Sequence, residues 1–167
     1  MPPRKLTTND LANMIGETIG PSEWLTITQD VVNQYGHAVN DLEWIHIDVP
    51  RAKAAFGGTI VYGLLTLSHL PTMWGMLIDL TDRGADLVYG FDNVRFLNVV
   101  HGGDRIRMST QVISMEPRGE GVLYRSRNTI EVEGRDKPAV VADWLLLVFP
   151  KGETALAKQA KLEGAGA

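Results

Sequence analysis

The chain has 167 residues, of which 44 % are hydrophobic and 22 % are charged, and this is the ordinary mix of one globular domain. Its net charge is −4 and it has no block of basic residues, which argues against a nucleic-acid partner. It contains no cysteine, which excludes disulfide bonds, a thiol nucleophile and a thiolate metal site.

The chain also lacks the segments that would direct it to a membrane. Its N-terminus, MPPRKLTTND, has no apolar core like that of a signal peptide. The longest apolar stretch, residues 60–70, is interrupted by polar side chains and is too short to span a bilayer. We therefore expect a soluble, cytoplasmic protein with no membrane partner.

Helix signals dominate the first part of the chain. Thr28 is suited to cap a helix that should end near Asn40. A shorter helix is predicted over residues 51–56, because Pro50 suits its first position and Gly57 its end. The other elements predicted here are a helix over residues 8–15 and a short strand over residues 24–27.

One acid and one imidazole, Asp41 and His46, lie five residues apart just beyond the Thr28 helix. On one continuous helix, residues at this spacing would point about 140° apart. The two side chains can therefore converge only if the chain leaves the helix between them. Spacing alone favours structural roles, in which Asp41 caps a helix end and His46 is a hydrogen-bonded core imidazole.

A long apolar helix is predicted to start near Thr59 and to continue to Leu80. Its apolar residues lie on nearly all sides, which predicts that it is buried all round. Pro71 lacks a backbone N–H and should bend the helix at that point.

After residue 85 the hydrophobic period changes to two, which is typical of strands. Glycine-containing turns separate the strands, as antiparallel hairpins require. The last strand is nearly all apolar and should lie inside the sheet. The predicted strands are Asp86–Phe96, Arg105–Glu116, Val122–Glu133 and Ala139–Phe149.

Helices first and strands after predict an α+β fold, in which an antiparallel sheet of about five strands curls around the long central helix. Residues 1–150 are expected to form this single domain. Residues 151–167 are rich in Ala, Gly and Lys and are expected to be a poorly ordered tail.

Several short segments give the chain a resemblance to a known family. They are IGPSEWLTITQ (19–29), Asp41 with WIHID (44–48), PRAK (50–53), FGGTI and GLLTLS within residues 56–68, YGFDNVRF (89–96), GDRIR (103–107) and DKPAVVAD (136–143). With these segments the chain resembles the MaoC-like hydratases, and within them the group similar to nodulation protein N. The resemblance implies the hot-dog fold and the chemistry of the (R)-specific enoyl-CoA hydratases.

The resemblance implies that Asp41 and His46 are the catalytic pair and hold one water molecule between them. Hydration of a 2-enoyl thioester needs a base for the water and an acid for C2. Histidine suits the first task because its usual pKa of about 6.5 leaves the neutral form abundant at pH 7. The backbone N–H of Gly63 is the implied donor to the thioester oxygen, although Gly63 also suits close packing.

Weaker candidates surround these three residues. Trp44 and Tyr62 suit either the acyl pocket or the core, whereas Arg95, Arg105 and Lys137 suit either the phosphates of coenzyme A or a solvated strand face.

Asp48 could orient the imidazole of His46, but a helix cap or an ion pair with Arg51 fits its position better. No third ligand has suitable spacing, so we expect no metal site. We expect no cofactor apart from the coenzyme A of the substrate.

Three departures from the family pattern leave the catalytic pair intact. Val39-Asn40 replaces Thr-Gly before the acid, Glu43-Trp44 replaces a Gln or Asn-Pro step before the His, and Tyr62-Gly63 replaces His-Gly at the helix start. With these departures, the resemblance does not determine which acyl group the substrate carries.

Three functions follow from these expectations. The first is a homodimeric hydratase that converts a 2-enoyl thioester, of coenzyme A or a carrier protein, to the (R)-3-hydroxyacyl thioester. The second is a thioesterase on the same fold, but residues 59–78 contain no carboxylate of the kind that several such enzymes place on the central helix. The third is a non-catalytic protein that binds an acyl thioester or another ligand.

Overall fold

The computed structural model describes residues 2–152, so the predicted tail lies outside the described residues except for its first two positions. The helices are α1 (Thr8–Ala12), α2 (Gln29–Val39), α3 (Trp44–Ile47), α4 (Val49–Phe56), α5 (Gly63–Ser68) and α6 (Leu70–Leu77). The strands are β1 (Arg4–Leu6), β2 (Thr18–Ile19), β3 (Leu25–Thr26), β4 (Ile78–Leu80), β5 (Arg83–Phe96), β6 (Arg105–Arg118), β7 (Gly121–Val132) and β8 (Val140–Pro150). Within residues 2–152, every helix falls short of the length and hydrophobicity that crossing a membrane requires.

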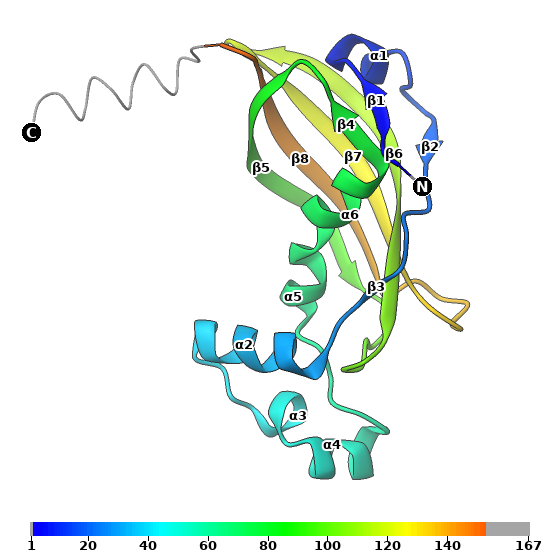
Figure 1. Cartoon of the computed structure of the whole chain (residues 1–167), viewed down its shortest axis with the longest axis vertical. Coiled ribbons are helices and arrows are strands. Elements are labelled where there is room, and N and C mark those ends of the chain that lie inside the picture. The colour runs from blue at the N-terminus through cyan, green and yellow to red at the C-terminus, as the bar shows by residue number, and fades with distance from the viewer. Residues whose placement is uncertain (1, 153–167) are drawn as a thin grey trace, which may run out of the picture.

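The main sheet is antiparallel and has the strand order β2-β6-β7-β8-β5, with β3 also paired to β6. It curls around α5 and α6 (Figure 1), and this arrangement is the hot-dog fold that the sequence predicted. The four long predicted strands are confirmed, and each boundary lies within three residues of its prediction. β8 lies between β7 and β5, as its almost continuous apolar sequence predicted.

The sequence did not predict a small parallel pair, β1 with β4. Each of these strands has only three residues, and this length is too short to show a hydrophobic period. The pair joins the start of the chain to the end of α6.

The central helix differs from its prediction in its start, its end and the place of its bend. It was predicted to continue to Leu80, but α6 ends at Leu77 and the next three residues form β4. The helix begins at Gly63, not near Thr59, and it is divided at His69 into α5 and α6. Thr59 is buried and donates its hydroxyl hydrogen to Gln29, so it does not cap the helix. The bend lies before Pro71 because proline is tolerated in the first turn of α6, where its missing N–H would have no helical partner.

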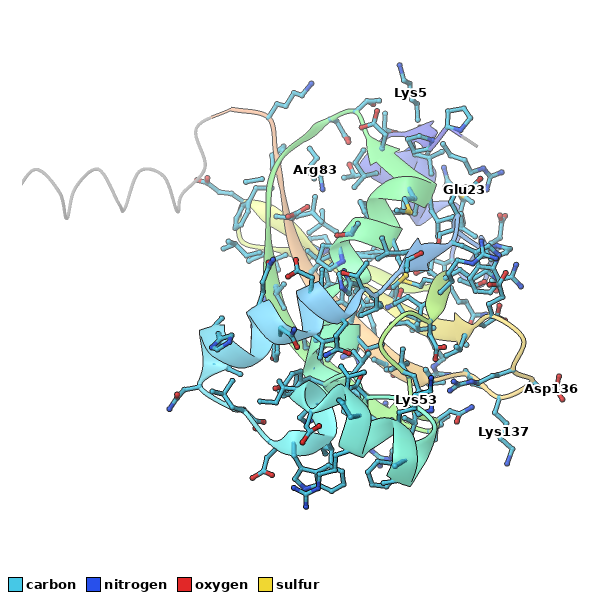
Figure 2. All side chains as sticks on the ribbon, turned by 60° about the horizontal axis from the view of Figure 1, so that its bottom comes forward. Lys5, Glu23, Lys53, Arg83, Asp136 and Lys137 are labelled. Carbon is cyan, nitrogen blue, oxygen red and sulfur yellow. The ribbon has the colours of Figure 1, made fainter. Side chains whose placement is uncertain are left out.

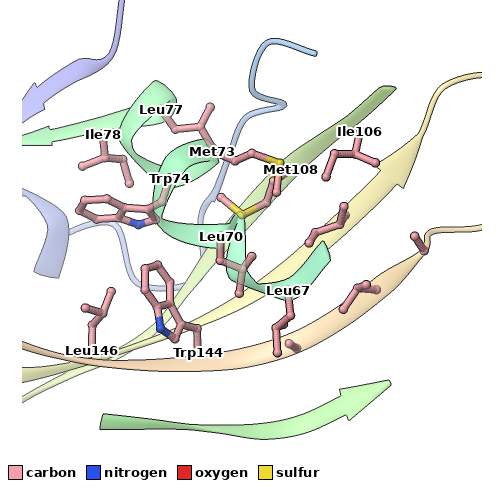
Figure 3. Close-up of a cluster of buried hydrophobic side chains, with 14 of the residues drawn as sticks. Leu67, Leu70, Met73, Trp74, Leu77, Ile78, Ile106, Met108, Trp144 and Leu146 are labelled. Carbon is pink, nitrogen blue, oxygen red and sulfur yellow. The ribbon is translucent and has the colours of Figure 1, made fainter. Parts of the chain in front are cut away.

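The core forms where one face of α5 and α6 packs on the concave side of the sheet (Figure 3). The helices contribute Leu67, Leu70, Met73, Trp74 and Leu77, and the strands contribute Ile106, Met108, Trp144 and Leu146. Burial of one such side chain contributes about 1.5–3 kcal/mol to folding.

The prediction that the central helix is buried all round is wrong. Leu64 on α5 is 62 % exposed, and Ser68 and Pro71 are also exposed. The sheet of one chain covers only one side of the helix, so the opposite side remains open in this chain.

One buried carboxylate links three strands of the sheet. Asp143 on β8 accepts hydrogen bonds from Arg127 on β7, at 2.8 and 3.2 Å, and from Asn93 on β5, at 2.8 Å. The bonds from Arg127 contribute most to holding the pKa of the Asp143 carboxyl below its usual range, and the bond from Asn93 adds to them against the opposing effect of burial. Charge-assisted bonds of this kind are among the stronger ones in proteins.

Replacement of Asp143 by Asn should therefore lower the free energy of unfolding by about 1–3 kcal/mol at pH 7. The native pKa of Asp143 is depressed, so its contribution is present above the unfolded value of about 3.9 and is lost as the pH falls through the native value. In urea unfolding, the stability difference between wild type and Asp143→Asn should thus be smaller at pH 3 than at pH 7. Asp92→Asn, which breaks a more exposed pair with Arg125, is the control and should change stability less. An Asp143→Asn effect of equal size at both pH values would contradict the assignment.

Candidate active site

Asp41 follows the C-terminal end of α2, a helix that lies near one end of the sheet (Figure 1). Asn40 adopts the left-handed conformation, with φ 56°, and the Asp41 N–H donates to the carbonyl of Gly36 at 3.0 Å. Asparagine is the residue other than glycine that tolerates this conformation best. The replacement of the family's glycine by Asn40 therefore preserves the turn that presents Asp41.

His46 lies on α3, a one-turn helix that was expected only as a connecting segment. The backbone of Ile60 holds it at two points. The Ile60 N–H donates to the carbonyl of Ile45 at 2.8 Å, and the Ile60 carbonyl contacts Nδ1 of His46 at 2.5 Å. Because a carbonyl only accepts, Nδ1 must carry the hydrogen, and the Nε2 lone pair is left available to take a proton.

Gln29, at the start of α2, adds a third hold on α3. Its Nε2 donates to the carbonyl of His46 at 2.8 Å, and its Oε1 accepts the hydroxyl hydrogen of Thr59. The sequence analysis did not identify Gln29 as a site residue. The two partners outside α2 lie 17 and 30 residues away. Its one local partner, Asn33 Oδ1 at 2.8 Å, belongs to α2 itself and does not mark Gln29 as a site residue.

Tyr62 connects the two members of the predicted pair. Its ring stacks on the His46 imidazole, with the centroids 3.7 Å apart, and its hydroxyl donates to the backbone carbonyl of Asp41. The described residues contain no direct ion pair between Asp41 and His46. α2 ends at Val39, before Asp41, and α3 begins at Trp44, so the two residues do not share one helix. Tyr62 contacts the backbone of Asp41 and the ring of His46.

Tyr62 is buried, with 6 % of its surface exposed. Burial raises the pKa of its hydroxyl above the usual value, and the negative charge of Asp41 raises it further. Both effects disfavour the phenolate, so Tyr62 remains a hydrogen-bond donor at neutral pH.

Gly63 is the first residue of α5 and faces a cleft of about 260 Å³. Within residues 2–152, no acceptor is found for its N–H, as expected for the first turn of a helix. The ring of Phe96 lies so close that a Cβ on Gly63 would meet it at 2.9 Å. The cleft is lined by Ile60, Val61, Gly63, Thr66 and Val140 and by residues 96–100, and Phe96 was not among the predicted site residues.

A larger cavity, of about 380 Å³, lies elsewhere, between β2 and the C-terminal end of α6. Its walls include Arg4, Ser22 and Glu23, but none of the predicted catalytic residues. The wall of the smaller cleft contains one of them, Gly63, but neither Asp41 nor His46. On the position of Gly63, the smaller cleft is the better candidate for the reaction.

Trp44 and Asp48 serve the packing of α3 and α4. The Trp44 ring stacks on Phe56, with a centroid distance of 5.6 Å, and the Arg51 guanidinium lies 4.0 Å from the Trp44 ring centroid. The Asp48 carboxylate accepts the backbone N–H of Arg51 at 3.1 Å and so caps α4.

The three basic candidates lie in different surroundings. Arg105 is paired with Glu133 across β6 and β7, so its charge is already engaged. Arg95 is exposed and precedes Phe96, which lines the cleft. Lys137 extends outward from the β7–β8 turn (Figure 2), and its carbonyl accepts a hydrogen bond from Asn98 on the cleft wall.

No group of three His, Asp or Glu side chains that could hold a metal ion occurs within residues 2–152. The expectation of no metal remains a prediction.

The hydrogen bond from His46 Nδ1 to the Ile60 carbonyl predicts the tautomer of His46. At alkaline pH, long-range ¹H–¹⁵N NMR of ¹⁵N-histidine-labelled protein should show Nδ1 protonated and Nε2 as the unprotonated nitrogen. His37, which is exposed on α2, is the internal reference and should show the mixture typical of a solvated imidazole. Protonation of Nε2 in His46 would contradict the hydrogen bond to Ile60.

Comparison with known proteins shows the family of the chain. A model of the MaoC-like domain matches residues 10–133. The 3-hydroxyacyl-thioester dehydratase Z of Mycobacterium tuberculosis is 40 % identical over 136 residues, which cover 80 % of this chain and 90 % of that protein. Nodulation protein N of Rhizobium leguminosarum bv. viciae is 33 % identical over 148 residues, which cover 86 % of this chain and 92 % of that protein.

Two solved structures share the fold. The monoamine oxidase regulatory protein from Archaeoglobus has a TM-score of 0.69 at 23 % identity, with 91 % of this chain and all of that chain covered. The (R)-hydratase from A. caviae involved in PHA biosynthesis has a TM-score of 0.64 at 20 % identity, with 79 % of this chain and 94 % of that chain covered. At such low identity the likeness concerns the fold alone.

Proposed function

Because the chain belongs to the family of MaoC-like domains, we propose that it is a hydro-lyase that interconverts 3-hydroxyacyl and 2-enoyl thioesters. We propose further that the hydroxyacyl product has the (R) configuration and that coenzyme A carries the acyl group. The observation that carries this proposal is the hydrogen bond from Nδ1 of His46 to the Ile60 carbonyl, which leaves Nε2 able to accept a proton. The imidazole stacks on Tyr62, the tyrosine whose hydroxyl binds the backbone of Asp41. The name of the dehydratase relative agrees with this reaction.

In the proposed hydration, His46 is the base. Its Nε2 takes a proton from a water molecule, and the oxygen of that water forms a bond to C3 of the enoyl group. The electrons of the C2=C3 double bond move toward the thioester oxygen, and C2 then receives the proton that His46 took. Asp41 accepts a hydrogen bond from the same water and orients it. The dehydration runs through these steps in reverse.

A hydrogen-bond donor is needed to stabilise the negative charge that develops on the thioester oxygen. Gly63 offers its N–H at the wall of the cleft, in the first turn of α5. A donor aimed at such an oxygen typically contributes a few kcal/mol to transition-state stabilisation. Arg95 and Lys137, which flank the cleft, are the proposed contacts for the phosphates of coenzyme A.

Replacement of either member of the pair should abolish hydration. With crotonyl-CoA and longer enoyl-CoAs, Asp41→Asn and His46→Gln should each lower kcat/KM by about 10²–10⁴-fold, measured as loss of the enoyl absorbance. Asp30→Asn and His37→Gln are matched controls on the exposed side of α2, and both should retain wild-type rates.

Release of free thiol, followed separately, decides between hydration and thioester hydrolysis. No carboxylate occurs on α5 or α6, so we expect no thiol release. Hydration that survives both substitutions in the pair would refute the site, and thiol release without loss of the enoyl group would favour the thioesterase.

We also propose that the protein is a homodimer that pairs through β5. Within the described residues this strand pairs only with β8, so its other edge is unpaired over 14 residues. Val88, Phe91 and Phe96 on β5 and Leu64 on α5 are exposed beside that edge. Long apolar edges are normally protected in native proteins, and a second copy would cover both this edge and the open side of α5.

A charge at this edge should prevent pairing. Val88 is 55 % exposed, and Val88→Glu should convert the dimer to a monomer in size-exclusion chromatography with light scattering. Ile15→Glu is the control, because Ile15 is 52 % exposed and precedes β2 at the opposite side of the sheet. A monomeric wild type, or a Val88→Glu variant that remains dimeric, would rule out this interface.

A further inference from the structure

We infer that Tyr62 is a positioning residue, which sets the distance and orientation between Asp41 and His46 without contacting the substrate through its hydroxyl. This inference rests on the proposed hydratase function. It assigns Tyr62 a role different from the wall of an acyl pocket that the sequence suggested.

Tyr62 contacts both members of the pair from one rigid place in the fold. It is the residue that caps α5, so its backbone is fixed by the start of the central helix. Its ring lies at 3.7 Å and 26° to the imidazole of His46. Tyr35 of α2 packs against the same ring, with a centroid distance of 5.0 Å, and so restricts its motion.

The hydroxyl of Tyr62 donates a hydrogen bond to the backbone carbonyl of Asp41. The other bonds of the turn from Asn40 to Glu43, within the described residues, are all local. The N–H groups of Asn40 and Asp41 donate to carbonyls of α2, the Glu43 N–H donates to the Asp41 carboxylate, and the Glu43 carbonyl accepts from the His46 N–H. Among the bonds of the described residues, the Tyr62 bond is therefore the one that ties this turn to the central helix. Its loss would free the turn that carries the carboxylate.

Gly36 provides the second, independent observation. It lies inside α2, where Ala would be about 1 kcal/mol more favourable by helix propensity. A Cβ at this position would lie 2.5 Å from the Tyr62 hydroxyl oxygen and 2.9 Å from the Asp41 carbonyl oxygen. Gly36 thus leaves room for the hydrogen bond between Tyr62 and Asp41, although glycine lowers the stability of α2.

The Asp41 carboxylate must be oriented to hydrogen-bond the attacking water, and small displacements of reacting groups have large effects on rate. Tyr62→Phe removes the bond to Asp41 but keeps the ring on His46. We expect kcat to fall about 10- to 100-fold while KM changes by about twofold or less, because substrate contacts remain. Tyr124→Phe is the matched control, since it removes another buried tyrosine hydroxyl, which accepts from Trp74 in the core.

Gly36→Ala should act through the same bond, by displacing the hydroxyl and the carbonyl. The kcat losses of Gly36→Ala and Tyr62→Phe should therefore be non-additive, and the double variant should be no worse than Gly36→Ala alone. Losses that multiply in the double variant would overturn the inference, as would a Tyr62→Phe variant with wild-type kcat.

A measurement on the protein without substrate tests the positioning role of Tyr62 separately from the proposed hydratase activity. In ¹H–¹⁵N NMR, Tyr62→Phe should shift the backbone amides of residues 41–43 and leave the tautomer of His46 unchanged, whereas Tyr124→Phe should do neither. If wild type fails to hydrate enoyl thioesters but these shifts occur, the proposed function fails and the positioning contact stands. If the amides of residues 41–43 do not move, the positioning role fails whatever the activity.

Discussion

The site depends on the backbone of Ile60, whose N–H and carbonyl both form hydrogen bonds to α3. Its N–H binds the carbonyl of Ile45 and its carbonyl binds the ring of His46. α3 has only four residues, and an isolated helix of this length is unstable because its first turn is costly to form. The segment that leads into the central helix therefore makes α3 possible and at the same time selects the tautomer that leaves Nε2 available.

The central helix and the sheet supply the rigid part of this arrangement. The helix begins at Gly63 because residues 59–62 are used to bind α2, α3 and Val100 through hydrogen bonds. The same late start places the free N–H of Gly63 at the wall of the cleft. α5 and β5 each contribute a residue, Gly63 and Phe96, to the wall of this cleft, so the elements proposed for pairing also border the proposed site.

The departures from the family pattern have separate physical meanings. Asn40 takes over the left-handed turn of a glycine and preserves the position of Asp41. Tyr62, in contrast, brings a long side chain that reaches both Asp41 and His46. Asn40 therefore acts on the backbone before Asp41, whereas Tyr62 acts on how the pair is held.

The sequence by itself determined the features that depend on neighbouring residues. These are the four long strands, the cap at Thr28, the end of α2 near Asn40 and the central position of β8. Only the tertiary structure decided the start of the central helix, the exposure of Leu64 and the contacts of Gln29, Ile60 and Tyr62. Periodicity and capping are set within a few residues, whereas these contacts join partners 14 to 30 residues apart, and their geometry exists only once the sheet has placed the helices.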